Sequence, residues 1–346
     1  MDYLFSNIET MHFTPVQMIG TQRSGSNLLR LMLNQLDEVS APHPPHILER
    51  FFPLLPAYND LTNPENFAQL VADVCKLIEF NPVPWSGLHL DTAAIIARCR
   101  HPLLTEVFRV IYEMRAESEN ARIWICKSLV NIRFADQLEE NGVRPLYIHL
   151  FRDGRDVALS FKKAIVGEKH MYYIAKQWKE EQEASLLLAD QLGPNRVIKV
   201  CYENLIQDPE LELRKLCSFI GAEYNSIALD YYRSEESHKT AISGVMWENV
   251  EKPVISNNYN KFLKELSAED ILLFEQVACD MLQKLGYTPM FPESERKIFS
   301  AEEISGFNEL NKKLKQEARL KQKPEDLEKR KGQELLLQRI QGRIKE

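Results

Sequence analysis

Residues 15–36, PVQMIGTQRSGSNLLRLMLNQL, decide the fold. The first six residues are mostly apolar and end at Gly20, which is typical of a short buried strand. From Ser26 to Leu36 the apolar residues recur at helical spacing, and a loop rich in glycine and serine joins the two patterns. This strand, loop and helix predict the opening unit of an α/β protein.

Three further strand patterns follow, at residues 122–126, 146–151 and 197–202. Helical patterns lie between and after them, at residues 153–164 and 209–220, and Gly221 is placed to cap the second of these helices. Apolar strands separated by helices predict a three-layer α/β/α fold with a central parallel sheet covered on both faces. Residues 41–102 hold many prolines and few strand patterns, so we expect a helical insertion or lid there.

The composition restricts the class of protein. The chain has 346 residues, of which 44% are hydrophobic and 27% are charged, close to the averages for folded globular proteins. No apolar run approaches the roughly 20 residues that a membrane span needs, and the start, Met1-Asp2-Tyr3, lacks the basic flank of a secretory signal. We therefore expect a cytoplasmic protein. The net charge of −7 argues against a nucleic-acid partner, because that function needs an extended basic surface.

The charge distribution marks a boundary near residue 295. Residues 295–346 hold 14 Lys and Arg against 10 Asp and Glu, which leaves 29 against 40 for residues 1–294. We expect one large domain over residues 1–294, which includes the helical insertion at residues 41–102, and a helical tail over residues 295–346. Two amphipathic helices are predicted in the tail from the apolar positions Phe307, Leu310, Leu314 and Ala318, and then Leu337, Ile340 and Ile344. Packing on the body, self-association and peripheral contact with an anionic surface are all open roles for it.

The six cysteines show no metal-binding or disulfide pattern. They are widely separated and form no CxxC pair: Cys75, Cys99, Cys126, Cys201, Cys217 and Cys279. This spacing is typical of reduced thiols buried as small hydrophobic side chains, and we expect no metal site.

The loop after the first strand predicts an anion site. Gly20 and Gly25 have the spacing of a phosphate-binding P-loop, GxxxxGK[ST]. The lysine of that motif is replaced by Ser26, and no acidic magnesium ligand clearly ends a strand, so a nucleoside triphosphate is disfavoured. Backbone N–H groups, the helix N-terminus and Arg23 remain available for an anion.

A second anion site is expected at the same edge of the sheet. Arg152 ends the third strand pattern, and Ser160 lies about two helical turns later. Lys127 ends the second strand pattern. Because the carboxyl ends of parallel strands share one edge, Arg23, Lys127 and Arg152 should line one crevice, which suits a ligand with two separated anionic groups.

Three segments together resemble the sulfotransferases that use 3′-phosphoadenosine-5′-phosphosulfate (PAPS): GTQRSGSNLLR, FRDGRDVALSF and CYENLIQDPELELRKLCSFIG. The resemblance covers most of residues 14–290. It implies that the 5′-phosphosulfate is held by the loop residues Arg23, Ser24, Gly25, Ser26 and Asn27. It further implies that Arg152 and Ser160 hold the 3′-phosphate, that Tyr202 contacts the adenine, and that Lys127 lies near the transferred group.

The chain departs from that family at the expected general base. The cytosolic enzymes carry a histidine two residues after the lysine, where this chain has Leu129, and they carry lysine at the position of Arg23. Golgi-type enzymes use a carboxylate shortly after the first helix, and His43 falls at about that position. We expect His43 to be the base, with His46 or Glu49 as the alternatives, because a neutral imidazole is available near neutral pH.

The late RKGxxG element of the cytosolic enzymes is also missing, and residues 243–253 are the candidate substitute that closes over the nucleotide. The aromatic residues of segment 41–102 fit an acceptor pocket or a hydrophobic core equally well.

The resemblance implies in-line transfer of a sulfuryl group from PAPS to a hydroxyl or amine of a small-molecule, sugar or lipid acceptor, with 3′,5′-ADP as product and no metal. Arg23, Lys127 and the base would be the catalytic residues. Two other hypotheses stay open at this point: a P-loop-type small-molecule kinase, and a non-catalytic nucleotide-binding protein.

Overall fold

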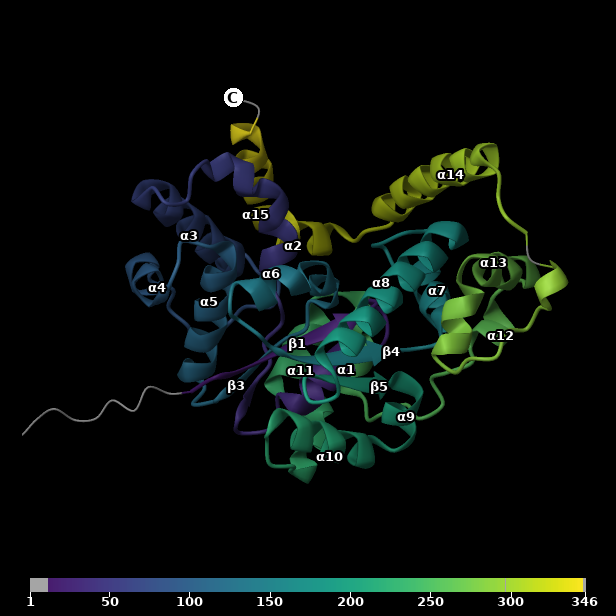
Figure 1. The fold of residues 1–346 in the computed structure, drawn as a ribbon, viewed down its shortest axis with the longest axis horizontal. Coiled ribbons are helices and arrows are strands. Elements are labelled where there is room, and N and C mark those ends of the chain that lie inside the picture. The colour runs from purple at the N-terminus through teal and green to yellow at the C-terminus, as the bar shows by residue number, and fades with distance from the viewer. Residues whose placement is uncertain (1–11, 296, 345–346) are drawn as a thin grey trace, which may run out of the picture.

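The computed structural model describes residues 12–295 and 297–344, and its core is a five-stranded parallel sheet in the order β2-β3-β1-β4-β5 (Figure 1). The strands are β1 (Thr14–Gly20), β2 (Val39–Ser40), β3 (Ile123–Cys126), β4 (Leu146–Phe151) and β5 (Val197–Cys201). The predicted strands and the parallel sheet are confirmed. Strand β2 is the one that the sequence pattern missed, because only two residues pair with β3.

One face of the sheet is covered by helices that follow β1 and β5. They are α1 (Ser26–Leu33), α9 (Tyr202–Gln207), α10 (Pro209–Ile220), the 3₁₀ helix η3 (Ser226–Arg233) and α11 (Glu235–Ile242). Val16 and Met18 of β1 are fully buried on this face against Leu29 and Leu33 of α1. Helix α10 has the predicted bounds and ends, as expected, at a left-handed Gly221.

The opposite face buries the alternate residues of the strands. Ile19 and Tyr147 pack beneath α6 (Ala135–Glu140), α8 (Met171–Leu192) and the 3₁₀ helix η2 (Leu129–Phe134). Trp124 of β3 packs against α5 (Leu104–Ser118). Around α8 lie α7 (Gly154–Lys163), α12 (Phe262–Glu265) and α13 (Ala268–Lys284), followed by the 3₁₀ helix η5 (Glu293–Glu295). The alternation along each strand therefore produces the predicted three layers.

Residues 41–102 are helical, as predicted. They form α2 (Ile47–Phe51), the 3₁₀ helix η1 (Phe52–Tyr58), α3 (Pro64–Glu79) and α4 (Thr92–Arg98). These elements share one apolar cluster with α5, in which Phe51, Tyr58 and Trp85 are buried. Most of the aromatic side chains in this segment therefore belong to a hydrophobic core, one of the two roles that the sequence allowed. Phe52 and Phe80 are less buried.

The tail forms two helices, as predicted: α14 (Ala301–Leu320) and α15 (Pro324–Arg343). Figure 1 shows that they lie over different parts of the molecule, α14 above α7 and α8, and α15 beside α2 and α3. In α14 the ring of Phe307 stacks on His170 with 4.6 Å between centroids, whereas Leu310 is 45% exposed.

In α15 the apolar residues buried in the core are Leu336 and Ile340, while Leu337 is only partly buried. Ile344, the last of the apolar positions at helical spacing, is 42% exposed. The packed face of α15 thus includes the predicted Ile340 and Leu337 and adds Leu336, because the neighbouring body surface, and not apolar spacing alone, selects the packed residues.

Within the described residues, no helix has both the length and the apolar character needed to cross a membrane. Met1, Asp2 and Tyr3, on which the expected lack of an export signal depends, lie outside the described residues. Four of the six cysteines are buried, which agrees with their expected role as small hydrophobic side chains.

Candidate active site

The carboxyl ends of all five strands meet at one edge of the sheet, and each strand is followed by a candidate functional residue. In the spatial order of the strands these residues are His43, Lys127, Arg23, Arg152 and Tyr202. All five line one cavity of 590 Å³. The sheet topology therefore collects residues that are as far as 179 positions apart in the sequence.

Two glycines allow the backbone of the loop after β1 to approach its neighbours closely. Gly20 has φ of 123°, and a Cβ atom there would lie 2.2 Å from the carbonyl oxygen of Leu150. Gly25 has φ of 92°, and a Cβ atom there would lie 2.3 Å from the ring of Tyr202. Both positions combine a left-handed backbone with a close contact, so neither tolerates a side chain without movement.

Arg23 links the loop to helix α7. Its Nε donates a hydrogen bond of 2.9 Å to Ser160 Oγ, and its own backbone is left-handed, with φ of 72°. Burial, together with the charge of Arg152, lowers the pKa of Arg23 from its ordinary value. Two like charges held close together in a buried site are stabilised by an anion between or beside them.

Arg152 is held in place by contacts on several sides. Its guanidinium lies 4.4 Å from the centroid of the Tyr202 ring and donates a 2.9 Å hydrogen bond to the backbone oxygen of Asn258. The side chain of Asn258 donates a 2.6 Å hydrogen bond to the hydroxyl of Tyr202. The Nε of Arg152 is buried and has no hydrogen-bond partner among the described residues. One donor of this fixed guanidinium is therefore left for a ligand.

The remaining loop residues divide into two groups. Gly25, Ser26 and Asn27 line the cavity. Ser24 does not line it, and its hydroxyl is buried. Both Ser24 Oγ and Asn27 Oδ1 lack a hydrogen-bond partner in the described part of the chain. The loop thus contains two buried polar atoms without a partner, of which only the hydroxyl of Ser24 can donate a hydrogen bond to an anion.

His43 faces the cavity from the segment after β2. Its side chain is 5% exposed, and neither ring nitrogen has a hydrogen-bond partner among the described residues. The ring of Trp247, in the 3₁₀ helix η4 (Val245–Glu251), meets it edge to face at 5.3 Å. Its backbone oxygen accepts hydrogen bonds of 2.7 Å from Trp85 Nε1 and 3.1 Å from Asn81 Nδ2. The backbone is anchored while the imidazole keeps both nitrogens available.

The surroundings of His43 favour a neutral imidazole. Burial, followed by the charges of Lys127 and Arg30, holds the pKa of His43 well below its usual value. A neutral imidazole is the form that can accept a proton.

His46 and Glu49, the alternative bases, are paired with each other. His46 Nδ1 lies 3.2 Å from Glu49 Oε2 and 3.1 Å from the hydroxyl of Ser128. Burial lowers the pKa of His46 despite the neighbouring carboxylate. Although burial acts to raise the pKa of Glu49, the contact with His46 leaves it lower than usual. This pairing occupies His46 Nδ1 and Glu49 Oε2, whereas both ring nitrogens of His43 have no partner among the described residues.

Lys127 is surrounded by positive charge. Its burial, together with Arg30 and Arg23, lowers the pKa of Lys127 to about 7. An anion in the cavity would favour the protonated form of this lysine, because it supplies the opposite charge that the surroundings lack.

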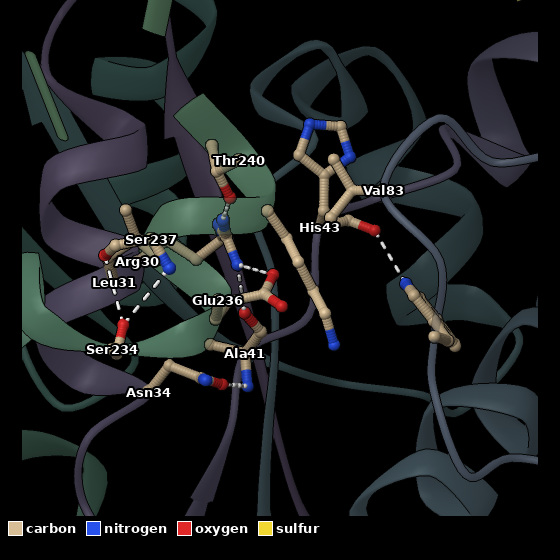
Figure 2. Close-up of polar contacts among 12 residues, drawn as sticks. Arg30, Leu31, Asn34, Ala41, His43, Val83, Ser234, Glu236, Ser237 and Thr240 are labelled. Carbon is tan, nitrogen blue, oxygen red and sulfur yellow. Dashed lines mark hydrogen bonds and ion pairs between the residues drawn. The ribbon is translucent and has the colours of Figure 1, made fainter. Parts of the chain in front are cut away.

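Arg30 of α1 links three segments of the chain through buried hydrogen bonds, a role that the sequence did not indicate. It is fully buried and donates hydrogen bonds of 2.9 Å to the backbone oxygen of Ala41, 2.8 Å to Glu236 and 2.8 Å to Thr240 (Figure 2). Asn34 accepts a 2.6 Å hydrogen bond from the backbone N–H of Ala41. Helix α1 therefore holds the backbone two residues before His43 on both sides, and it also holds the helix that leads to Trp247.

Comparison with known proteins agrees with this arrangement. A family model described as "Sulfotransferase family" matches residues 15–226. The chain belongs to the sulfotransferase family. The match covers the strand ends β1 to β5 and the loop after β1, and it stops before the segment that carries Trp247 and before the tail.

Individual sulfotransferases are only distantly similar. A curated relative, protein-tyrosine sulfotransferase A of Caenorhabditis elegans, is 22% identical over 277 residues. That match covers 78% of this chain and 66% of the relative, so the chain spans slightly less than two thirds of the relative's length.

Two solved sulfotransferase domains share the fold. The domain of the olefin synthase of Synechococcus PCC 7002 has a TM-score of 0.51 at 21% identity, and it matches 79% of this chain and 98% of its own length. The domain from the curacin biosynthetic pathway has a TM-score of 0.51 at 19% identity, and it matches 80% of this chain and 98% of its own length.

Several cavity residues of this sulfotransferase were not predicted from its sequence. Asn258 and Lys261 come from the connection before α12, and Lys163 from the end of α7. Arg50 comes from α2 and Arg330 from α15. None of them lies in a motif, and a surface lysine or arginine has no distinguishing sequence pattern, so only the folded chain identifies them. Residues 243–253 were expected to close over the nucleotide. Three of them, Trp247, Asn249 and Val250, line the cavity.

Across residues 12–295 and 297–344, no group of three or more His, Cys, Asp or Glu side chains is arranged to hold a metal ion.

Proposed function

We propose that this sulfotransferase moves a sulfuryl group from PAPS to a hydroxyl or amine of an acceptor. One observation carries the proposal: the five strand ends bring His43, Lys127, Arg23, Arg152 and Tyr202 to a single cavity in that order. The order separates a neutral imidazole at one end from an arginine stacked on an aromatic ring at the other. A nucleotide with two anionic groups and an acceptor that must lose a proton need such a division.

The residues present fit PAPS. The loop residues Arg23 to Asn27 would hold the 5′-phosphosulfate, with the N-terminus of α1 directed toward it. Arg152 and Ser160 would hold the 3′-phosphate, and the free Nε of Arg152 supports that assignment. Tyr202, which already packs on the glycine loop and beneath Arg152, would contact the adenine.

In the proposed reaction the bond between sulfur and the bridging oxygen of PAPS breaks as a bond forms between sulfur and the acceptor atom. The leaving bridging oxygen stays on the 5′-phosphate of 3′,5′-ADP, and the acceptor proton passes to His43. Such a transition state spreads negative charge over the transferred group and the leaving oxygen, by analogy with phosphoryl transfer. Arg23, Lys127 and the loop N–H groups would stabilise that charge.

His43 is favoured as the base by its geometry. Its two ring nitrogens have no partner among the described residues, whereas His46 shares its Nδ1 with Glu49 and Ser128. His46 and Glu49 stay as the alternatives if the acceptor enters from their side of the cavity.

The acceptor belongs to a broad class at this stage. The cavity size admits a small-molecule, sugar or lipid hydroxyl next to the nucleotide. The curated relative is a protein-tyrosine sulfotransferase, which adds a phenolic hydroxyl of a protein to the candidates.

The first test compares thermal stabilisation by 3′,5′-ADP and 5′-AMP. A ligand that binds only the folded state raises the melting temperature according to its affinity, so 3′,5′-ADP should give the larger shift. Equal shifts would remove the 3′-phosphate site. An acceptor screen with ³⁵S-labelled PAPS follows. If 3′,5′-ADP binds but no acceptor is sulfated, a non-catalytic binding protein is favoured. ATP turnover with a hydroxyl substrate would favour a kinase.

A further inference from the structure

Helix α15 forms one wall of the active-site cavity. Arg330, Gln333 and Glu334 line it, although they lie more than 100 residues beyond the end of the family match. Residues Arg50, His46 and Glu49, from the segment at and just before α2, line the same cavity. The tail is therefore part of the candidate active site. Arg330, one of the basic residues of the segment 295–346, faces the cavity.

The position of α15 is set by specific contacts with the body. Gln333 Nε2 donates a 2.8 Å hydrogen bond to the backbone oxygen of Leu77. Leu336 and Ile340 are buried in the core formed by the insertion helices. At the C-terminal end of the helix, Arg343 forms a 2.9 Å ion pair with the buried carboxylate of Asp73. These polar and apolar contacts fix the position of α15, and so they fix the position of Arg330 in the cavity wall.

Two half-buried arginines face this end of the cavity. Neither the Arg50 nor the Arg330 side chain has a hydrogen bond or an ion pair with another residue in the described part of the chain. Burial lowers the pKa of Arg50, the charges of Glu49 and Glu334 act to raise it, and repulsion from Arg330 acts to lower it. Arg330 also contributes to the lowered pKa of His43, the proposed base, and both side chains line the same cavity.

Two carboxylates lie near these charges without pairing with them. Glu49 Oε2 lies 3.2 Å from His46 Nδ1, and Glu334 lies one helical turn after Arg330 and has no ion pair among the described residues. The guanidinium groups of Arg50 and Arg330 are therefore left without an acceptor in the described part of the chain. An anion would accept hydrogen bonds from them, and charge-assisted hydrogen bonds to guanidinium groups are among the strongest that a protein makes.

The space continues beyond the arginine pair. A second, smaller cavity of 320 Å³ shares Arg50 and Glu334 with the first and is walled by Pro53, Leu54 and Leu337. An acceptor that reaches past Arg50 would meet this partly apolar groove between η1 and α15.

We infer that Arg50 and Arg330 bind an anionic group, a carboxylate, phosphate or sulfate, on the acceptor whose hydroxyl or amine faces His43. This inference rests on the proposed function and restricts its acceptor to anionic molecules. It also assigns the tail a role in acceptor recognition. The nucleotide, held at the β1, β4 and β5 strand ends, does not use this pair.

The test uses two pairs of probes that differ in charge but hardly in shape: 4-hydroxyphenylacetate with 4-hydroxyphenylacetamide, and D-glucuronate with D-glucuronamide. Binding of each probe to the full chain is measured by thermal shift and calorimetry with 3′,5′-ADP at saturation, which occupies the two phosphate sites. The carboxylate of at least one pair should bind more tightly than its amide. The same comparison without nucleotide tests the anion site even if 3′,5′-ADP does not bind.

Variants assign the preference to the arginine pair. Arg330→Gln and Arg50→Gln should each weaken the carboxylate about tenfold and leave the amide unchanged, as expected for one lost charge-assisted hydrogen bond. Glu334→Gln should change affinity in the opposite direction, which keeps the inference testable if an arginine variant folds poorly. Lys331→Gln is the matched control, because Lys331 is on the same helix, 59% exposed at its side chain and paired with Glu328.

Equal binding of carboxylate and amide in both probe pairs would overturn the inference. A carboxylate preference that survives in both arginine variants would overturn it too, and loss in a Lys127→Met variant would then show that the probe occupies the sulfuryl position. Failure of 3′,5′-ADP itself to bind the wild-type protein contradicts the proposed function, and the nucleotide-free comparison still decides the anion site.

Discussion

Arg23 Nε donates a 2.9 Å hydrogen bond to Ser160 Oγ, across 137 positions of sequence. The contact joins the loop after β1 to helix α7 after β4, which are the two segments assigned to the two anionic groups of the nucleotide. A ligand that bridges these segments would therefore bind to side chains that are already oriented toward each other.

Replacement of Ser160 tests the 3′-phosphate site with little disturbance of the fold. Ser160→Ala should weaken 3′,5′-ADP about tenfold and leave 5′-AMP nearly unchanged, because only the first ligand has a 3′-phosphate for the hydroxyl to bind. Calorimetric titration measures both affinities. Ser118→Ala, at an exposed hydroxyl on α5, is the control. A parallel loss for both nucleotides would show that Ser160 acts only through Arg23.

Replacement of His43 tests the base. His43→Ala should lower the rate of transfer by about 10² to 10⁴ while the affinity for 3′,5′-ADP changes by less than about twofold, since general-base catalysis contributes on that scale. Rates are measured with the best acceptor from the screen, and His46→Ala and Glu49→Gln are compared in parallel. Normal turnover in His43→Ala, or a larger loss in either of the others, would move the role to His46 or Glu49.

The rate should also depend on pH through His43. A base must be deprotonated to accept a proton, so the rate falls as the pH falls through its pKa. Burial, Lys127 and Arg30 lower that pKa below the usual 6.5, and the acid limb of the rate profile should therefore lie below pH 6.5. An acid limb above pH 6.5 that is present in the wild type and persists in His46→Ala would contradict this prediction.

Lys127 should take up a proton when nucleotide binds. Its pKa is about 7 in the free protein, and an anionic ligand raises it, so at pH 8 a mostly neutral lysine becomes protonated in the complex. Calorimetry of 3′,5′-ADP binding in buffers with different ionisation enthalpies measures this proton. Lys127→Met should abolish this proton uptake at pH 8. At pH 6, where the lysine is already charged, the variant and the wild type should take up the same number of protons. An unchanged proton count in the variant would rule Lys127 out.

Gly25→Ala tests the close approach between the loop and Tyr202. The new methyl group would meet the ring at 2.3 Å in a left-handed backbone, so both stability and nucleotide affinity should fall. Gly142→Ala is a matched control, because Gly142 also has a left-handed backbone, with φ of 76°, but no atom within 4 Å of the added methyl group. The control should lose only the conformational term, about 1 to 2 kcal/mol. Equal losses of stability in thermal melts would exclude the steric effect.

The fold was predictable to a large extent, because its signals are local. Four strand patterns, the glycine loop and the Gly221 cap each depend on residues that are close in sequence, and the structure confirms them. Strand β2 was missed because its two residues carry no periodicity, yet it sets the place from which His43 enters the cavity. A strand of that length is formed by its pairing with β3, which is a tertiary interaction.

The candidate site was predictable only where residues follow strands or stand in motifs. The sequence proposed Arg23, Lys127, Arg152 and Ser160, and the structure brings all four to one cavity. It did not indicate Arg30, whose buried contacts are spread over α1, the segment after β2 and α11. A single arginine within an apolar helix has no pattern that distinguishes a buried connector from a surface charge.

By itself the sequence determined that the chain is an α/β protein with a glycine- and serine-rich loop after its first strand and a basic helical tail, since glycine spacing, apolar periodicity and charge are properties of neighbouring residues. Only the tertiary structure decided the order of the side chains along the cavity, the free imidazole of His43 and the entry of Arg330 into the cavity wall. These depend on contacts between segments as far as 270 residues apart, such as the ion pair of Arg343 with Asp73, which are fixed by packing against the sheet and the insertion helices and leave no local trace in the sequence.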